Sequence, residues 1–291
     1  MIQLDRKVFF AAVRKSLFWG KLTQAQVDGM NDLLDVWQER GSADPRHLGY
    51  ALATDYHETG SKMQPVREGF KTTDKAARGW VQRHYGHKGP KWYCWPQGPH
   101  GHVYYGRGDV QLTWYENYLK MGEILGLPLA EKPDMVLQSK VSKAVLIEGM
   151  LNGASQDGDF TGKSLEDYFN DEDDDPIGAR RIVNGTDKAQ LIASYYDEFM
   201  DAIDVALEAY EQADMFDREH IEEENPVKLP PKSDGITWGA VLSATTGIGA
   251  AVGGLTEKLS GPAALVAIGL IVVGIALVAT GRKRILRETG E

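Results

Sequence analysis

Two glutamates ten residues apart have the residue type that acid and base catalysis requires. Glu58 ends the segment Tyr56-His57-Glu58, and Glu68 follows a break in the chain marked by Gly60 and Pro65. Hydrolysis of a glycosidic bond uses one carboxylic acid to protonate the leaving oxygen and a second carboxylate to activate water or attack the sugar. The pair could do this chemistry, although two ordinary surface glutamates would leave the same pattern.

The residues before Glu58 predict a helix that holds it at its C-terminal end. Leu48, Leu52 and Tyr56 recur at helical spacing, and Gly60 is a suitable stop. Unpaired carbonyls at a helix C-terminus favour the protonated form of a carboxyl group, and apolar neighbours would add to this by desolvation. We therefore expect Glu58 to be the proton donor of the pair.

Other signals in the first two hundred residues are also mainly helical. Thr23 and Gln26 form a capping box before a run of apolar residues at helical spacing, and a second helix is expected between Asp187 and Tyr210. Strand signals are few, and we expect at most a small hairpin at Val103–Leu112. The predicted fold class is mainly α, with a minimal hairpin.

The composition excludes some classes of protein. A formal net charge of -10 over 291 residues argues against a non-specific nucleic-acid binder, which needs clustered Lys and Arg. Cys94 is the single cysteine, so an internal disulfide is excluded and synthesis in a reducing compartment is indicated. Charges at Asp5, Arg6 and Lys7 do not fit a cleavable secretory signal.

Composition also divides the chain into three parts. Residues 1–215 are expected to be the globular catalytic domain, 216–235 an acidic and proline-rich linker, and 236–291 a membrane-anchoring region. The last part would contain a helix at 236–255, a transmembrane helix at 261–280 and a basic tail at 281–291.

The anchoring region contains two uncharged stretches. Residues 263–280 carry no charge, and with Gly261 and Pro262 they reach about 20 residues, or about 30 Å as a helix, enough to span a bilayer. The alternative is a buried helix of a soluble domain. The stretch 236–255 contains Gly249-x-x-x-Gly253, which permits close helix contact, and it is either a second membrane segment or an interfacial or soluble helix.

A motif in the middle of the chain resembles that of a known enzyme family. Tyr104-Tyr105-Gly106-Arg107-Gly108-Asp109-Val110-Gln111-Leu112-Thr113-Trp114, closed by Asn117-Tyr118, is similar to the second signature of glycoside hydrolase family 19, which comprises chitinases and phage endolysins. The segment ending in His57-Glu58-Thr59-Gly60 resembles the one that holds the family's general acid. The resemblance continues through 158–163 and 179–185, so it covers about residues 20 to 210.

The resemblance implies roles for individual residues and a lysozyme-like α-helical domain. It implies Glu58, Glu68 and Thr113 as catalytic residues, with Thr113 helping to hold the attacking water. It implies substrate contacts at His57, Tyr105, Gln111, Asn117 and Asn184. For Gly106, Arg107 and Gly108 we expect a structural role, because glycines allow a sharp turn and arginine can hold a carboxylate in fork geometry.

The sequence departs from the chitinase pattern at three places. Plant-type chitinases have the general base further along the chain, near Trp80 here, whereas the endolysin-like branch keeps the Pro-Val-x-Glu that contains Glu68. Asp109 stands where chitinases usually have proline or alanine, and Glu116 replaces an aromatic residue. By family analogy we expect inversion, with the two carboxyl groups about 6.5 to 9.5 Å apart; a gap near 5 Å would argue for retention.

We expect no metal and no cofactor. The group His84, His87, Cys94, His100 and His102 has ligand types suited to zinc but irregular spacing. The acidic run 171–175 lacks the glycine and terminal glutamate of a calcium loop, so a solvated loop is expected there. Between the motifs, the aromatic residues are expected mostly in the core, with one or two lining a groove.

These features predict a phage endolysin-like enzyme that cleaves β-1,4 bonds in peptidoglycan. Its expected partners are glycan strands, the lipid bilayer and, as candidates, a holin or virion proteins, with no nucleic acid. Arg282, Lys283, Arg284 and Arg287 would keep the tail in the cytoplasm, which favours a two-span hairpin on the host inner membrane, or carriage in a virion, before action on the periplasmic wall. The alternatives are a chitinase, a lytic transglycosylase, or a non-catalytic membrane-bound phage structural or wall-binding protein.

Overall fold

A computed structural model describes residues 2–151 and 160–224, with side chains up to residue 216. This part of the chain is mainly helical, with one small sheet, which agrees with the predicted fold class. Its elements are α1 (Arg6–Ser16), α2 (Gln24–Arg40), α3 (Pro45–Glu58), β1 (Val66–Arg67), η1 (Glu68–Phe70), α4 (Asp74–Tyr85), η2 (Gly86–Lys88), β2 (Arg107–Gly108), α5 (Tyr115–Leu125), η3 (Pro133–Leu137), α6 (Ser139–Leu151), η4 (Leu165–Asp167), η5 (Gly178–Ile182) and α7 (Ala189–Glu224).

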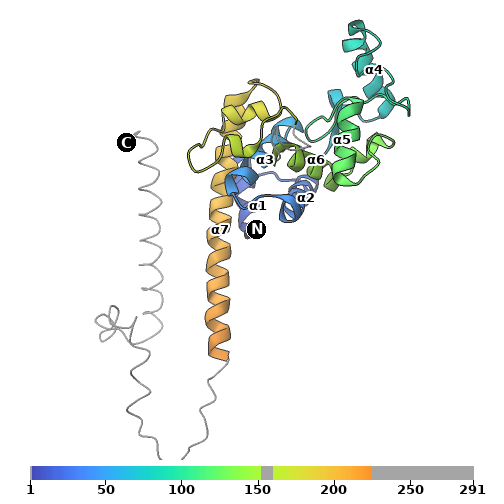
Figure 1. Cartoon of the computed structure of the whole chain (residues 1–291). Helices are drawn as coiled ribbons and strands as arrows, with labels where there is room; N and C mark the ends of the chain where they lie inside the picture. The colour runs from blue at the N-terminus through green and yellow to red at the C-terminus, as the bar shows by residue number, and fades with distance from the viewer. Residues whose placement is uncertain (1, 152–159, 225–291) are drawn as a thin grey trace, which may run out of the picture. The chain divides into compact units, whose positions relative to one another are not determined.

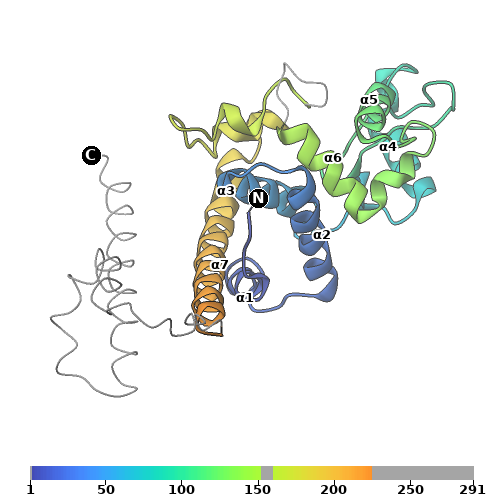
Figure 2. The same ribbon diagram turned by 60° about the horizontal axis from the view of Figure 1, so that its bottom comes forward.

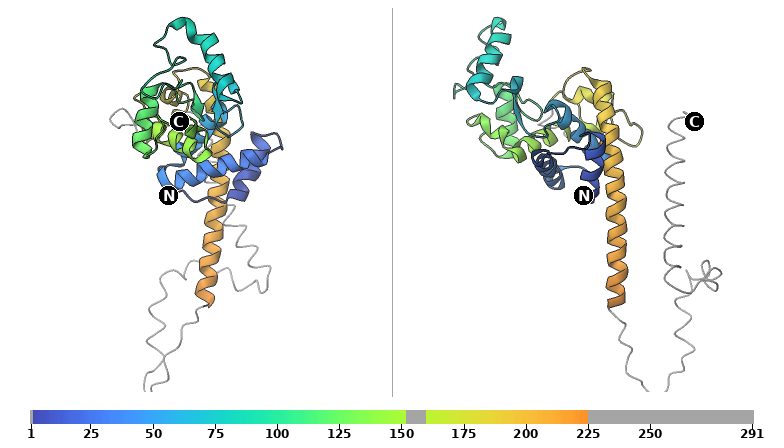
Figure 3. Two further views of the ribbon diagram at one scale, coloured as in Figure 1. Left: turned by 90° about the vertical axis from the view of Figure 1, so that its right-hand side faces the viewer. Right: turned by 180° about the vertical axis from the view of Figure 1, so that it is seen from behind.

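The helices pack around two hydrophobic clusters. Helix α3 lies against α7 and α6, α1 lies against α7, and α2 packs on α6, so α3 is central to the larger cluster (Figure 1). Helices α4 and α5 lie at the opposite end of the described part from α7, as Figures 2 and 3 also show. The smaller cluster joins α4 to the segment before β2 through Ala77, Val81, Tyr93, Cys94, Val103 and Tyr105.

Helix α3 forms as the sequence predicts, and it positions Glu58. Asp44 caps its N-terminus by accepting a hydrogen bond from the backbone N–H of Arg46, and Pro45 occupies the first turn, where its missing N–H costs nothing. Gly60, at φ 60°, follows the C-terminal cap, as expected of a helix stop. Glu58 is the last residue of the helix, which confirms its predicted position.

The sheet differs from the predicted local hairpin at Val103–Leu112. β2 pairs antiparallel with β1, with Val66 opposite Gly108 and Arg67 opposite Arg107. Arg107 and Leu112 do exchange two backbone hydrogen bonds, of 2.9 and 3.2 Å, so a tight turn lies inside the motif. The strand partner comes from a distant segment, which the alternation of residues inside the motif does not reveal.

Helix α7 is longer than the sequence suggested. It was expected to end at Tyr210, with a linker starting at residue 216, but it continues to Glu224, so the first part of the predicted linker is helical. No helix within the ranges described above has the length and apolar character needed to span a membrane. The predicted segments 236–255 and 261–280 and the basic tail 281–291 lie outside the described residues.

Candidate active site

Glu58 has a charged partner that the sequence did not reveal. Its Oε1 accepts a hydrogen bond of 2.6 Å from Nη1 of Arg180, whose side chain is 2% exposed. Arg180 belongs to η5, and its Nε donates to the carbonyl of Asp187 at 2.9 Å, which fixes the guanidinium. The expected apolar surroundings of Glu58 are therefore wrong, because a buried cation meets the carboxylate instead.

Glu68 is held by the motif itself. Its Oε2 accepts a hydrogen bond of 2.8 Å from the backbone N–H of Gly106, and its Oε1 accepts one of 2.8 Å from the hydroxyl of Tyr93. In addition, the backbone N–H of Glu68 donates to the carbonyl of Gly106 at 2.7 Å. Two hydrogen bonds thus fix the carboxylate, and two bonds with Gly106 hold Glu68 to the motif, although it lies far from the motif in the sequence.

The segments that carry the two glutamates lie side by side. Gly60 and Phe70 are each two residues beyond a glutamate, and a Cβ placed on Gly60 would lie 3.3 Å from the ring of Phe70. The structure therefore brings the end of α3 and the start of η1 together, as the proposed acid and base require. Phe70 is 52% exposed, so its ring is accessible beside this contact.

Arg107 has the structural role that its motif predicts. Its side chain is 2% exposed, and its guanidinium contacts Asp134 at 2.8 Å and Asp74 at 3.4 Å. It also donates to the carbonyls of Val103 and Tyr105 at 3.2 Å each. Burial lowers the pKa of Arg107, but charge interactions with Tyr118 and Tyr105 and hydrogen bonds to Tyr118 and Asp134 raise it overall, so the group is a fixed cation inside the fold.

The two glycines beside this arginine allow close packing. Gly108 has φ 85°, and a Cβ there would lie 2.7 Å from Oγ of Ser142. At Gly106 a Cβ would lie 2.8 Å from Oε1 of Gln111. Gly108 therefore has to be glycine because of both its φ and its neighbours, whereas a Cβ at Gly106 would require the Gln111 side chain to shift.

A chain of hydrogen bonds connects the predicted catalytic and substrate-binding residues of the motif. Nε2 of Gln111 donates to the carbonyls of Val66 and Gly108 at 3.1 and 3.0 Å. The hydroxyl of Thr113 donates to the carbonyl of Gln111 at 2.6 Å, and the amide of Asn117 donates to the carbonyl of Thr113 at 2.8 Å. Gln111 therefore ties β1 to the motif, while the exposed Asn117 lies one helical turn beyond Thr113.

The remaining predicted substrate contacts divide into two groups. Tyr105 is completely buried, with its hydroxyl donating to Asp74 at 3.1 Å, so its predicted contact with substrate is wrong and it packs in the core instead. His57 is half-buried beside Glu58, and burial lowers its pKa. Asn184 is exposed just after η5, and its backbone N–H donates to the carbonyl of Arg180 at 3.0 Å. His57 and Asn184 thus both lie near the Glu58–Arg180 pair.

Strained backbone gathers around the same segments. Left-handed φ values between 54° and 75° occur at Ser61, Met63, Phe70, Gln111 and Trp114. Such values are costly for residues other than glycine, and they persist where surrounding structure over-determines them, commonly at functional sites. Five of the seven such residues in the described chain therefore lie after Glu58, after Glu68 or before α5; the other two are Trp19 and Lys188.

Two residues of the site were not foreseen from the sequence. Arg180 lies in the segment 179–185, which was singled out only for its asparagine, and Tyr93 lies in the aromatic-rich segment assigned mostly to the core. A buried arginine beside a proposed catalytic motif is a signal that could have found the first. No local signal distinguishes Tyr93 from Trp92 or Trp95.

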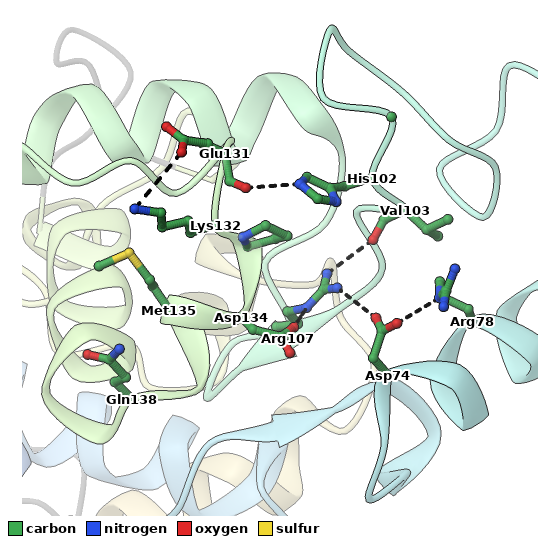
Figure 4. Close-up of a pocket in the computed structure, with 12 residues that line it drawn as sticks. Asp74, Arg78, His102, Val103, Arg107, Glu131, Lys132, Asp134, Met135 and Gln138 are labelled. Atoms are coloured by element: carbon green, nitrogen blue, oxygen red, sulfur yellow. Dashed lines mark hydrogen bonds and ion pairs between the residues drawn. The ribbon is translucent and has the colours of Figure 1, made fainter.

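A cavity of about 630 Å³ has Arg107 among its lining residues (Figure 4). Asp74, Arg78, His102, Lys132 and Asp134 are among its lining residues, and neither Glu58 nor Glu68 lines it. Figure 4 shows Arg107 between Asp134 and Asp74, both turned toward its guanidinium. The cavity is therefore separate from the segments that carry the two glutamates.

The histidine and cysteine positions considered for zinc do not form a ligand set. Within residues 2–151 and 160–224, no three His, Cys, Asp or Glu side chains gather closely enough to hold a metal ion. His102 Nε2 is instead 2.9 Å from the carbonyl of Glu131, and Cys94 is buried in the smaller cluster.

A helix-end glutamate and a second, motif-bound glutamate on adjacent segments are the arrangement of the glycoside hydrolase class. Within that class, residues 46–147 match the family model described as chitinase class I, glycoside hydrolase family 19. This segment, which is about a third of the chain, is similar to the chitinase-like family, and it contains Glu58, Glu68 and the whole motif.

Curated relatives are similar to part of the chain. An endochitinase of Arabidopsis thaliana is 37% identical over 100 residues, which are 34% of this chain and 30% of the relative. An inactive chitinase-like protein of Hevea brasiliensis is 44% identical over 52 residues, which are 18% of this chain and 15% of that protein. The match thus spans less than a third of the length of these relatives.

Two solved structures are also similar. Chitinase C from Streptomyces griseus matches with a TM-score of 0.42 and 20% identity, covering 69% of this chain and 76% of that chain. A bacterial family 19 chitinase matches with a TM-score of 0.41 and 21% identity, covering 69% of this chain and 94% of that one.

Proposed function

We propose that this protein hydrolyses β-1,4 glycosidic bonds between amino sugars, with the glycan strands of peptidoglycan as substrate. Glu58 donates a proton to the leaving oxygen, and Glu68, helped by Thr113, activates the attacking water. The observation that carries the proposal is the double anchoring of the Glu68 carboxylate by Gly106 and Tyr93, beside the helix end that carries Glu58.

The hydrogen bonds around Glu68 suit a general base. Its carboxylate accepts from a backbone N–H and a hydroxyl, both at 2.8 Å, so its orientation is fixed before substrate arrives. Fixed geometry of this kind lowers the barrier because little reorganisation is needed during the reaction. The Thr113 hydroxyl donates to the carbonyl of Gln111 at 2.6 Å, so its oxygen can accept a hydrogen bond from the attacking water.

The contacts of Glu58 suit a group that changes partners during catalysis. Arg180 holds one carboxylate oxygen at 2.6 Å, while the side chain stays 18% exposed. A sugar that enters from the exposed side competes with Arg180 for this carboxyl group. His57 and Asn184, on either side of the pair, contact the sugar.

Peptidoglycan and chitin both contain β-1,4-linked amino sugars, so chitin is a second candidate substrate. The endochitinases among the relatives favour it, whereas the endolysin-like position of Glu68 favours peptidoglycan. Purified full-length chain should be incubated with each polymer and the products identified by mass spectrometry. We expect new reducing ends from peptidoglycan; reducing ends from chitin alone would assign the protein as a chitinase.

The products of this experiment also distinguish hydrolysis from a lytic transglycosylase reaction and from a protein without catalytic activity. A lytic transglycosylase needs only one acid, so anhydro-sugar products and full activity in Glu68→Gln would replace the hydrolytic mechanism. A non-catalytic phage structural or wall-binding protein would release no products. One relative is named as an inactive chitinase-like protein, so activity has to be measured and not inferred from similarity.

We also propose that the domain is lysozyme-like and that residues 236–291 tether it to the host inner membrane. The uncharged stretch 263–280 and the basic residues after it support the tether. In this arrangement the catalytic domain stays on the cytoplasmic face, or travels in a virion, and reaches the periplasmic wall when the membrane is breached, with a holin as a candidate partner. Protease added to intact spheroplasts should leave the domain uncut; cleavage from outside would contradict the two-span hairpin.

A further inference from the structure

A completely buried lysine joins the two catalytic segments. Lys143 of α6 has a side chain that is 0% exposed, and its Nζ lies 2.7 Å from Oδ2 of Asp55 and 3.1 Å from Oδ2 of Asp109. Both carboxyl side chains are also 0% exposed. The ammonium donates hydrogen bonds to Asp55 and, at 3.2 Å, to the carbonyl of Met63, and it forms an ion pair with Asp109.

The three acceptors come from the segments that carry the proposed chemistry. Asp55 is one turn before Glu58 on α3, and its carbonyl accepts a hydrogen bond of 2.6 Å from the hydroxyl of Thr59. That hydroxyl accepts in turn from the N–H of Met63 at 3.0 Å, which fixes the chain after the helix. The ammonium of Lys143 therefore contacts the chain on both sides of Glu58, at the side chain of Asp55 and at the carbonyl of Met63.

The other side of the cluster is the motif. Asp109 directly follows Gly108, and its backbone N–H donates to Oγ of Ser142, the neighbour of Lys143, at 2.8 Å. Two residues further on, Gln111 begins the hydrogen-bonded series that leads to Thr113. The aspartate that departs from the usual chitinase residue at this position is thus the residue that reaches the buried lysine.

We propose that Lys143 is a positioning residue: its ammonium, held between Asp55 and Asp109, fixes the end of α3 that carries Glu58 against the motif that carries Gln111 and Thr113. The catalytic part of this inference rests on the proposed function. Lys143 does not contact substrate, and it acts through the two segments it joins.

Charge balance adds a dependence on pH. One ammonium facing two carboxylates would leave a net negative charge in the core, which is costly, so one carboxyl group retains a proton. Burial, with the nearby carboxyl of Asp109, raises the pKa of Asp55 to about 7. Oδ1 of Asp55 and both carboxyl oxygens of Asp109 are buried without a hydrogen-bond partner, and a proton held between the two carboxyl groups would provide one.

The charged groups that face the ammonium come from both packed segments. They are Asp55 from α3 and Asp109 from the motif, and their attraction outweighs burial and raises the pKa of Lys143. The lysine therefore stays charged over the range in which Asp55 titrates. Loss of the shared proton leaves a net negative charge in the cluster and weakens the contact that Lys143 makes between α3 and the motif.

The sign of the effect on stability follows from the raised pKa. The folded protein binds the proton on Asp55 more tightly than the unfolded chain does, so this stabilisation is complete below about pH 4 and is lost as the pH rises through about 7. Asp55→Asn carries a neutral amide at every pH and keeps one positive and one negative charge in the cluster. The variant should therefore lack this part of the pH dependence.

The first test measures, without using activity, whether Lys143 holds the end of α3 against the motif. In the full chain, Lys143→Met should speed amide hydrogen exchange in residues 56–64 and 104–114 while α1 keeps its protection. Lys140→Met is the matched control, because Lys140 lies on the same helix, is 62% exposed and forms a salt bridge of 3.4 Å with Asp35. A folded Lys143→Met with unchanged exchange in both segments would overturn the proposal.

The second test covers the case in which Lys143→Met does not fold. The thermal midpoint of the wild type should fall by several degrees more between about pH 5 and about pH 8 than that of Asp55→Asn. Equal changes of the thermal midpoint in the two proteins would contradict the shared proton and the pH dependence of the Lys143 cluster.

Activity then distinguishes this inference from the proposed function. If the wild type releases reducing ends, Lys143→Met should lower kcat on the order of 100-fold with little change in KM, Lys140→Met should retain the wild-type value, and Asp55→Asn should have a flatter kcat profile above about pH 7. If the wild type is inactive on every glycan, the proposed function fails, while hydrogen exchange and thermal unfolding still decide whether Lys143 joins the segments.

Discussion

The two glutamates acquire their proposed roles from partners that lie far away in the sequence. Arg180 reaches Glu58 across 122 residues, and Tyr93 reaches Glu68 across 25. The sequence predicted both glutamates because a family motif and a helix end mark them. It could not predict their partners, because a hydrogen bond between side chains of distant segments leaves no local pattern.

The contact between Tyr93 and Glu68 makes a prediction at the residue scale. Tyr93→Phe removes the hydroxyl that holds Oε1 of the proposed base, so kcat should fall by about tenfold, in line with the loss of one hydrogen bond to a charged group, while KM changes little. Steady-state kinetics on solubilised glycan strands would measure this.

Tyr104→Phe is the matched control for this prediction. Tyr104 is buried as Tyr93 is, and its hydroxyl donates to the carbonyl of Ala130 at 2.6 Å and to neither glutamate. The control should lose a similar amount of stability and keep its kcat. If Tyr93→Phe is as active as Tyr104→Phe, then Tyr93 does not orient the base.

At the scale of elements, the sequence predicted helices well and strand pairing poorly. The capping box at Thr23 and Gln26 is present, and α3 ends at Glu58 followed by Gly60, because caps and stops are local. β2 pairs with β1 and not with its own neighbourhood, because two-residue strands carry too little alternation to identify a partner.

The turn at Gly108 makes a prediction at this scale. Gly108→Ala would combine a left-handed φ of 85° with a Cβ only 2.8 Å from Cγ1 of Val136, so the free energy of unfolding should fall by well over about 1 kcal/mol. The motif would also shift, and activity should be lost with stability. Chemical denaturation and kinetics would measure the two effects.

Gly126 supplies the control for Gly108. It too has a left-handed φ, of 66°, but no atom lies within 4 Å of an added Cβ. Gly126→Ala should therefore cost only about 1 kcal/mol of backbone strain and leave activity unchanged. Equal destabilisation by the two substitutions would mean that close packing at Gly108 contributes nothing.

At the scale of the whole molecule, the sequence divided the chain by composition and misplaced one boundary. The helix expected to end at Tyr210 runs to Glu224, because the acidic residues that suggested a solvated linker are also good helix formers. The position of Glu58 also depends on packing across the whole domain, because α3, which carries it, lies against α7 and α6. Apolar periodicity predicts that these helices pack together, but it does not predict which helix packs against which.

The proposed membrane tether makes a prediction for the full chain. Replacing Leu270 and Val273 by arginine puts two charges in the middle of 261–280, and each should disfavour insertion by about 2.5 to 3.5 kcal/mol. The double variant should stay in the supernatant when lipid vesicles are sedimented, while the wild type should pellet with them. Pelleting of both proteins would contradict a transmembrane helix at this position.

The proton donated by Glu58 is the step on which the proposed function depends. Rates of reducing-end release from purified peptidoglycan should be compared for the wild type and Glu58→Gln, with hydrogen exchange confirming that both fold alike. Loss of general acid catalysis should slow the variant by about 10²- to 10⁴-fold. A folded Glu58→Gln that releases reducing ends at the wild-type rate would contradict the role of Glu58 as the catalytic acid.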